Sequence, residues 1–157
     1  MTAWSPERIF EELGVSWQDI DCGGIKLRLD KVFKFKGQGM LSRDEKTLPD
    51  VEEVAENNGF YYLEPGSYRI RYMEKIIIPD NALGLAIPRS SLLRMGASIF
   101  TAVWDPGYMG RGEGLLVVYN PYGIIIERGS QMAQLVLIGL DRKTKKLYRG
   151  TYYGENI

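Results

Sequence analysis

From Gly59 onward the chain alternates short apolar runs with turn residues. The runs are rich in Tyr, Ile and Val, and turn signals such as Pro65-Gly66, Pro79-Asp80 and Pro106-Gly107 separate them. Many short strands at close spacing with little helix between them favour a sandwich, a jelly roll or a closed barrel. The predicted strands cover residues 60–63, 68–72, 76–78, 83–87, 97–103, 115–119, 124–127, 132–140 and 146–152.

The first part of the chain is less regular. Ser5-Pro6-Glu7 has the pattern of an N-cap, a first-turn proline and an acidic first turn, which predicts a short helix ending at Leu13 before Gly14. Apolar and charged residues alternate through 27–35, which predicts a strand. The polar stretch 37–58 predicts a loop that carries a short helical turn, with its charges on a solvated face.

The composition narrows the possible chemistry. The chain has 157 residues, the usual size of one domain, and we expect residues 1–157 to form a single one. It contains no His and one Cys, which excludes an internal disulfide, a Cys/His zinc site and catalysis by a Ser-His-Asp or Cys-His arrangement. Hydrolysis would need a carboxylate to activate water, or a hard cation held by oxygen atoms.

Charge and hydropathy argue against nucleic-acid and membrane partners. The net charge is zero, so the chain lacks the overall basic field that wraps nucleic acid, and we expect no nucleic-acid partner. The first ten residues lack the apolar core of a signal peptide, and no apolar run reaches membrane-spanning length. We therefore expect a cytoplasmic protein with no membrane partner.

A first candidate site lies in 88–94, where a strand ends at Pro88 and a helical turn begins. Arg89, Ser90, Ser91 and Arg94 place two hydroxyls between two guanidinium groups at the start of that turn. Free backbone N–H groups there favour anions, and Arg offers paired donors to phosphate oxygens. A plain alternative is that Ser90 caps the turn while both arginines face solvent.

A second candidate is the turn at 102–110, in which Asp105 ends an apolar run and enters a Pro-Gly turn. A carboxylate at the mouth of a β-rich pocket can act as a general base on water. Tyr108 follows three residues later, with a ring able to pack on a sugar or a base. Asp before Pro-Gly also commonly does no more than cap a turn.

Two weaker candidates follow. Gln131 and Gln134, at the start of a long apolar strand, could donate to phosphate or be ordinary polar residues of a strand start. The C-terminal stretch 148–154 contains Arg149 and Tyr152; it could close over a bound base by stacking, or be a frayed last strand.

In this order and at these spacings, the four segments together resemble the trimeric dUTPase and dCTP deaminase superfamily. P-R-S-S-L-L-R at 88–94 looks like its second motif, A-V-W-D-P-G-Y-M-G at 102–110 like its third, and G-S-Q-M-A-Q at 129–134 like its fourth. Y-R-G-T-Y-Y-G at 148–154 is similar to the closing segment of the deaminase branch. From about residue 20 to the C-terminus, the chain is most similar to archaeal dUTPases.

The resemblance implies a mainly β fold, a distorted jelly roll with a short N-terminal helix, assembled as a homotrimer with sites at the subunit interfaces. It implies hydrolysis of dUTP to dUMP and pyrophosphate, by attack of water on the α-phosphorus. The cofactor would be Mg²⁺, held mainly by the triphosphate and water rather than by protein ligands.

Roles follow for the matching positions. Asp105 would orient and deprotonate the water, and Tyr108 would pack beneath deoxyribose and exclude a 2′-hydroxyl. Backbone groups of Thr101, Ala102 and Val103 would read uracil. The triphosphate would be held by Arg89, Ser90, Ser91 and Arg94 with Gln131 and Gln134, and the closing segment with Arg149 and Tyr152 would cover the nucleotide.

The chain also departs from the family pattern. The first motif usually has Asp-Leu where this chain reads G-I-K-L-R-L at 24–29, and the carboxylate nearest in sequence is Asp30. Many dUTPases carry Arg where this chain has Gln131. The Glu that deaminases use corresponds to Leu115 or Val117, depending on the direction of counting, and the nearest carboxylate is Glu113.

Two alternatives to dUTP hydrolysis remain. One is dCTP deamination, alone or combined with hydrolysis, with Glu113 in an unexpected position. The other is a trimeric jelly-roll protein without catalysis.

Overall fold

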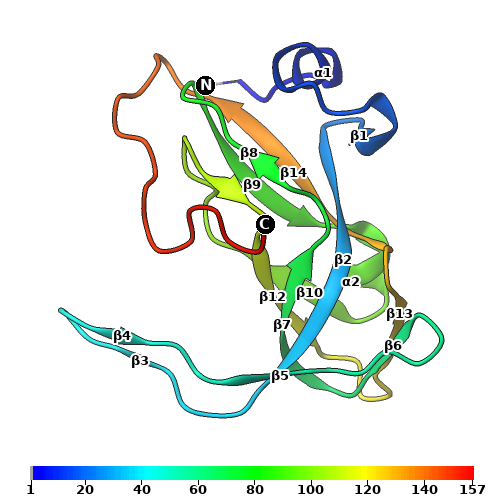
Figure 1. Cartoon of the computed structure of the whole chain (residues 1–157). Coiled ribbons are helices and arrows are strands. Elements are labelled where there is room, and N and C mark those ends of the chain that lie inside the picture. The colour runs from blue at the N-terminus through cyan, green and yellow to red at the C-terminus, as the bar shows by residue number, and fades with distance from the viewer. Residues whose placement is uncertain (1) are drawn as a thin grey trace.

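The computed structural model describes residues 2–157 and is mainly β, as the sequence predicts (Figure 1). The largest sheet runs in the antiparallel order β10-β12-β7-β2-β14-β9, with β1 and β5 also paired to β2. Three two-stranded sheets, β11-β8, β13-β6 and β3-β4, complete the jelly-roll-type fold. The elements are α1 (Pro6–Leu13), the 3-10 turn η1 (Trp17–Asp19), β1 (Ile20–Asp21), β2 (Gly24–Phe35), β3 (Met40–Leu41), β4 (Lys46–Thr47), β5 (Val51–Glu53), β6 (Phe60–Leu63), β7 (Gly66–Tyr72), β8 (Ile76–Ile77), β9 (Ala82–Pro88), α2 (Ser90–Arg94), β10 (Ala97–Phe100), β11 (Met109–Gly110), β12 (Glu113–Val118), β13 (Ile124–Glu127) and β14 (Gln131–Gly139).

Strand β2 joins the two halves of the large sheet. Its first half pairs with β14 and its second half with β7, and the register shifts between Leu29 and Lys31, where the strand passes from one partner to the other. An irregularity of this kind bends a strand and increases its twist. The bend in β2 therefore curves the large sheet around one core.

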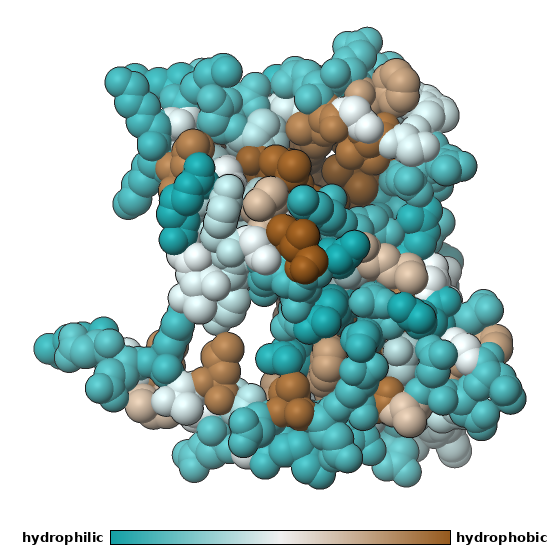
Figure 2. All heavy atoms as spheres, in the orientation of Figure 1, coloured by the Kyte–Doolittle hydropathy of each residue, from teal (hydrophilic) through white to brown (hydrophobic). Residues whose placement is uncertain are grey.

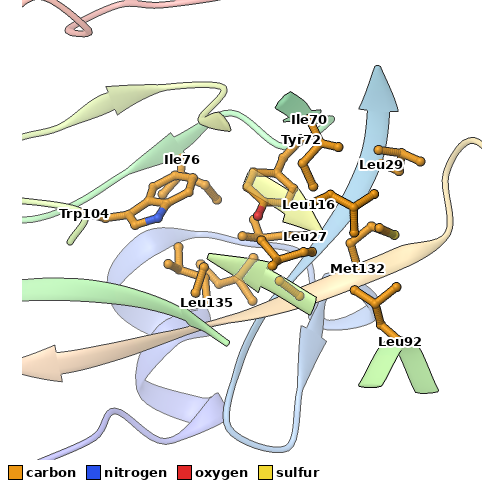
Figure 3. Packing of buried hydrophobic residues seen from close by; sticks show 14 of the residues in the cluster. Leu27, Leu29, Ile70, Tyr72, Ile76, Leu92, Trp104, Leu116, Met132 and Leu135 are labelled. Atoms are coloured by element: carbon orange, nitrogen blue, oxygen red, sulfur yellow. The ribbon is translucent and has the colours of Figure 1, made fainter. Parts of the chain in front are cut away.

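The core lies between these two halves (Figure 3). Leu27, Tyr72, Leu116 and Leu135 are fully or almost fully buried and point toward one another, although they come from four different strands. Each of the three leucines contributes about 1.5–3 kcal/mol when it leaves water. Trp104 lies at one end of this cluster, so the core extends directly beneath the turn that carries Asp105.

The N-terminal helix forms as predicted. The Ser5 hydroxyl accepts a hydrogen bond from the backbone N–H of Arg8 at 3.3 Å, and Gly14 ends the helix in the left-handed conformation with φ 64°. Ile9 is the residue of the helix that is buried. Among residues 2–157, no helix is both long and apolar enough to cross a membrane.

The helical turn expected in 37–58 is absent from this part of the described chain. The segment instead forms the β3–β4 hairpin, which projects as an arm in Figure 1, and then β5, which pairs with β2. The difference arises because Val51–Glu53 pair through their backbone with β2. Glu53 also forms an exposed ion pair with Lys31 of β2 at 2.9 Å, and Glu52 one with Lys36, just after β2, at 2.7 Å. The acidic cluster therefore belongs to an exposed strand.

Two strand predictions are wrong in part or in full. β10 ends at Phe100, and residues 101–103 leave the sheet before Trp104 forms an isolated bridge with Gly84. Residues 146–152 form no strand; they run as irregular chain that ends in a turn, and the Tyr148 N–H donates to the Pro106 carbonyl at 2.8 Å. Their backbone partners are thus in a loop and not at a sheet edge.

Candidate active site

A pocket of about 480 Å³ opens beside the Asp105 turn. Of the predicted site residues, it brings together Ala102, Val103, Asp105, Tyr108 and Tyr152. Its other walls come from distant parts of the chain, including the base of the β3–β4 arm and the C-terminal segment, which Figure 1 shows returning in red to the middle of the molecule. These additional lining residues are Phe35, Leu48, Pro49, Arg69, Trp104, Gly112, Glu113, Tyr148 and Glu155.

The backbone of the Asp105 turn is held on both sides. Trp104 exchanges two 2.9 Å hydrogen bonds with Gly84 of β9, and the Gly107 N–H donates to the Ile78 carbonyl at 2.9 Å. Gly107 has φ 83°, a conformation that favours glycine. Asp105 itself is exposed, so a rigid turn presents its carboxylate to water at the pocket mouth.

Tyr108 forms part of the pocket floor. Its ring is buried, packs edge-on against Trp104 with centroids 5.2 Å apart, and lies 6.0 Å from the ring of Tyr148. Its hydroxyl donates to the Glu155 carboxylate at 2.7 Å. Burial, reinforced by this hydrogen bond, raises the pKa of Tyr108, which keeps the phenol protonated and able to donate.

A second pocket of about 420 Å³ contains three of the residues predicted to bind phosphate. Arg89, Ser90 and Gln134 line it together with Asp21. Arg89 forms an ion pair with Asp21, and this guanidinium, with the backbone N–H of Cys22, lowers the pKa of the Asp21 carboxyl. With its amide oxygen turned toward the β1–β2 turn, Gln134 accepts from the N–H groups of Gly23 and Gly24 at 3.0 and 3.1 Å.

The remaining predicted residues lie outside these two pockets. Ser91, Arg94 and Gln131 are exposed, the first two on α2 and the third at the start of β14. Thr101 lines a shallower hollow beside the first pocket and donates to the Ala86 carbonyl at 3.2 Å. Arg149 donates to the Gly107 carbonyl at 3.3 Å from the covering segment. One chain alone therefore does not bring all the predicted residues into one concavity.

Glu113 lines the first pocket but has other partners. One of its oxygens lies 3.2 Å from Arg69 and the other 3.1 Å from Arg71, and the Asn156 amide donates to it at 3.4 Å. A carboxylate paired with two guanidinium groups is poorly placed to accept a proton from a substrate. This arrangement weighs against the deaminase role considered for Glu113.

The sequence interpretation missed two carboxylates of these pockets. Asp21, rather than Asp30, lies beside the phosphate-type residues; Asp30 forms an ion pair with Arg128 at 2.7 Å instead. Glu155 contacts Tyr108 from the C-terminal segment. No sequence signal marks either residue, because each reaches its pocket through a chain reversal or a long-range contact.

Across residues 2–157, no three Asp, Glu, His or Cys side chains cluster in a way that could hold a metal ion. Mg²⁺ commonly keeps several waters and binds through substrate phosphates with one or two carboxylates. Asp21 is the carboxylate of the second pocket, so the available donors fit a metal ion that binds together with a phosphate ligand.

Comparisons of sequence agree with the predicted resemblance. The chain is 41% identical over 138 residues to the probable deoxyuridine 5′-triphosphate nucleotidohydrolase of Aeropyrum pernix, covering 88% of this chain and 87% of that protein. It is 42% identical to the deoxyuridine 5′-triphosphate nucleotidohydrolase of Methanocaldococcus jannaschii, over 83% of this chain and 85% of that protein.

A comparison of structures supports the fold. The crystal structure of 2′-deoxycytidine 5′-triphosphate deaminase from Agrobacterium tumefaciens matches 86% of this chain with a TM-score of 0.65 and 18% identity. The chain spans 46% of the length of that protein. The family model described as dCTP deaminase-like matches residues 7–140, and the chain therefore belongs to the dCTP deaminase-like family, as its motifs predicted.

Proposed function

We propose that this protein is a dUTP diphosphatase, which hydrolyses dUTP to dUMP and pyrophosphate. The observation that supports this most is the rigid turn that presents Asp105 and Tyr108 to one pocket, in a chain 41–42% identical to proteins named deoxyuridine 5′-triphosphate nucleotidohydrolase. The carboxylate is exposed to water, and the aromatic ring beside it is buried and fixed.

In this proposal Asp105 is the general base. It orients a water molecule and accepts its proton as the oxygen attacks the α-phosphorus, and the bond to the pyrophosphate group breaks. Tyr108 packs beneath the deoxyribose and leaves no room for a 2′-hydroxyl. Thr101, Ala102 and Val103, which leave the sheet after β10, read uracil with their backbone groups.

Residues of the second pocket, and exposed residues near them in sequence, hold the triphosphate. Arg89, Ser90 and Gln134 share the second pocket, and Ser91, Arg94 and Gln131 are exposed close to them in sequence. Arginine forks and helix-start N–H groups suit phosphate oxygens. Arg149 and Tyr152, on the C-terminal segment, cover the bound nucleotide.

The complete site forms in a homotrimer. The phosphate-binding residues of one subunit face the Asp105 pocket of the next subunit. Exposed large apolar side chains support this assembly. Ile87 lines the second pocket, Leu93 lies on α2 and Phe100 ends β10, and each is more than half exposed. Figure 2 shows apolar patches interrupting the hydrophilic surface of one face. Such patches commonly mark protein contacts.

Mg²⁺ is the proposed cofactor. Among the described residues no carboxylate cluster could hold the ion, so the triphosphate and water would supply most of its ligands. Asp21 would be the protein carboxylate beside it in the second pocket. When bound, the ion neutralises phosphate charge that would otherwise oppose attack at phosphorus.

The test is a pyrophosphate-release assay with Mg²⁺ on dUTP, dTTP, dCTP and UTP. We expect turnover of dUTP well above the other three, and a loss of at least about a hundredfold in Asp105→Asn. Asp141→Asn is the matched control, because Asp141 is 87% exposed and lies in neither pocket. Unchanged turnover in Asp105→Asn would show that the general-base assignment is wrong.

Measuring ammonia as well as pyrophosphate in the same reactions decides between the alternatives. Ammonia release from dCTP would support deamination. This activity is tested because the matching family model is described as dCTP deaminase-like and because Glu113 lines the first pocket. Absence of pyrophosphate release from every nucleotide would favour the non-catalytic trimer.

A further inference from the structure

We propose that Glu155 is a positioning residue for the discrimination between deoxyribonucleotides and ribonucleotides. It acts through the hydroxyl of Tyr108, whose ring it fixes in the position that excludes a 2′-hydroxyl. The inference rests on the proposed role of Tyr108, and it adds a residue outside 7–140, the range that matches the family model.

The contact between the two side chains is short and shielded. The Tyr108 hydroxyl lies 2.7 Å from a Glu155 oxygen, and 7% of Tyr108 is exposed. A hydrogen bond to a carboxylate is stronger than one between neutral groups, and shielding from water strengthens it further. The ring is therefore held at both ends, by its own backbone and by its hydroxyl.

The backbone around the pair leaves little freedom. Gly110 lies so close that an added Cβ would meet the Tyr108 hydroxyl at 2.9 Å and the Glu155 carbonyl oxygen at 3.0 Å. Its φ of 156° is also one that side chains rarely adopt. Glycine at this position thus permits the C-terminal segment to approach the ring.

The segment that delivers Glu155 is tied down on both sides of it. The Gly154 N–H donates to the Met109 carbonyl at 2.8 Å, and the Arg111 N–H donates to the Glu155 carbonyl at 3.1 Å. Asn156 and Arg111 exchange two side-chain-to-backbone hydrogen bonds, both 2.9 Å. These bonds fix the backbone of Glu155 and hold its carboxylate within hydrogen-bonding distance of the Tyr108 hydroxyl.

Exclusion of one hydroxyl by a ring depends on the stiffness of the ring. A phenol without its partner can tilt away from the sugar and make space for an additional oxygen. Removal of the Glu155 carboxylate should therefore relax discrimination while leaving the Asp105 chemistry in place.

The experiment compares Glu155→Ala, Glu155→Gln and Ile157→Ala with the wild type. Two quantities are measured for each: kcat/KM for dUTP over UTP, and the affinity ratio of the α,β-imido analogues of dUTP and UTP by calorimetry. We expect Glu155→Ala to lower both ratios about tenfold, the effect of losing one charge-assisted hydrogen bond. Glu155→Gln keeps an acceptor for the hydroxyl and should retain most of the discrimination.

Ile157→Ala is the matched control, because it changes the same C-terminal segment at a side chain that is 60% exposed and lines neither pocket. If it lowers the ratios as much as Glu155→Ala does, or if Glu155→Ala leaves them unchanged, the inference is wrong. Melting temperatures confirm that the variants are folded. A wild type that binds the dUTP analogue preferentially but hydrolyses neither nucleotide contradicts the proposed function, and the calorimetric ratios still decide the role of Glu155.

Discussion

Asp21 of β1 holds the guanidinium of Arg89 at the end of β9, so the arginine proposed to bind phosphate already has an anionic partner in its own chain. The pair lies in a pocket with Ser90 and Gln134 and is partly exposed. A triphosphate that approaches Arg89 must share it with this carboxylate or displace it. Asp21 therefore opposes nucleotide binding when no cation is present to offset its charge.

This relationship predicts the effect of Asp21→Asn. Without Mg²⁺, we expect the variant to bind α,β-imido-dUTP about three- to tenfold more tightly than the wild type, because one negative charge leaves the pocket. With Mg²⁺ the gain should shrink. Calorimetry with and without Mg²⁺ measures both, and Asp141→Asn provides the control for a general change in charge. Weaker binding by Asp21→Asn in both conditions would mean that Asp21 mainly holds Arg89 in place.

The packing of Trp104 against Gly112 makes a second prediction. A Cβ on residue 112 would collide with the indole ring, which forms a wall of the first pocket. We expect Gly112→Ala to destabilise the fold by about 1–3 kcal/mol, as overpacking does, and to lower kcat/KM for dUTP. Urea unfolding and the pyrophosphate assay test the two effects. Gly37→Ala is the control, because nothing lies within 4 Å of its added Cβ.

Local signals were sufficient for several elements of the fold. The strands β6 and β13 and the helix α1 have the predicted bounds, because alternation, turn residues and capping act over a few positions. The strand prediction for 146–152 is wrong. The Tyr and Leu residues of this segment favour a strand, but its backbone hydrogen-bond partner lies in a loop about forty residues earlier. Local propensity contains no information about such a partner.

The candidate site shows the same limit. The motif around Asp105 and Tyr108 was predicted, and the structure places both on one pocket. Asp21 and Glu155 were not, since each acts through a partner more than 40 positions away, Arg89 and Tyr108 respectively. Contacts of that separation depend on the folded topology.

The environment of Glu155 predicts a dependence of stability on pH. Burial is the main cause that raises the pKa of this carboxyl above its usual 4.5, while the Tyr108 hydrogen bond partly opposes it. The folded state therefore holds the proton more tightly than the unfolded state. This contribution to stability is complete below pH 4.5 and is lost as the pH rises through the folded-state pKa.

Glu155→Gln removes that titration. We expect the free energy of unfolding of the variant, measured in urea from pH 4 to pH 8, to gain on that of the wild type as the pH rises. The exposed Glu127 offers a control, and Glu127→Gln should follow the wild type at every pH. A constant difference between Glu155→Gln and the wild type would contradict this expectation.

A mixing experiment tests whether two subunits share each site. If Asp105 of one subunit works with Arg89 of the next, Asp105→Asn and Arg89→Ala each damage every site of a pure trimer. In trimers formed from equal amounts of the two variants, random assembly gives both intact residues at about a quarter of the sites. We expect dUTP turnover to rise toward about a quarter of the wild-type value after joint refolding, whereas separately refolded and then combined samples stay inactive. A site contained in one chain cannot recover in this way, because every subunit still carries one of the two substitutions.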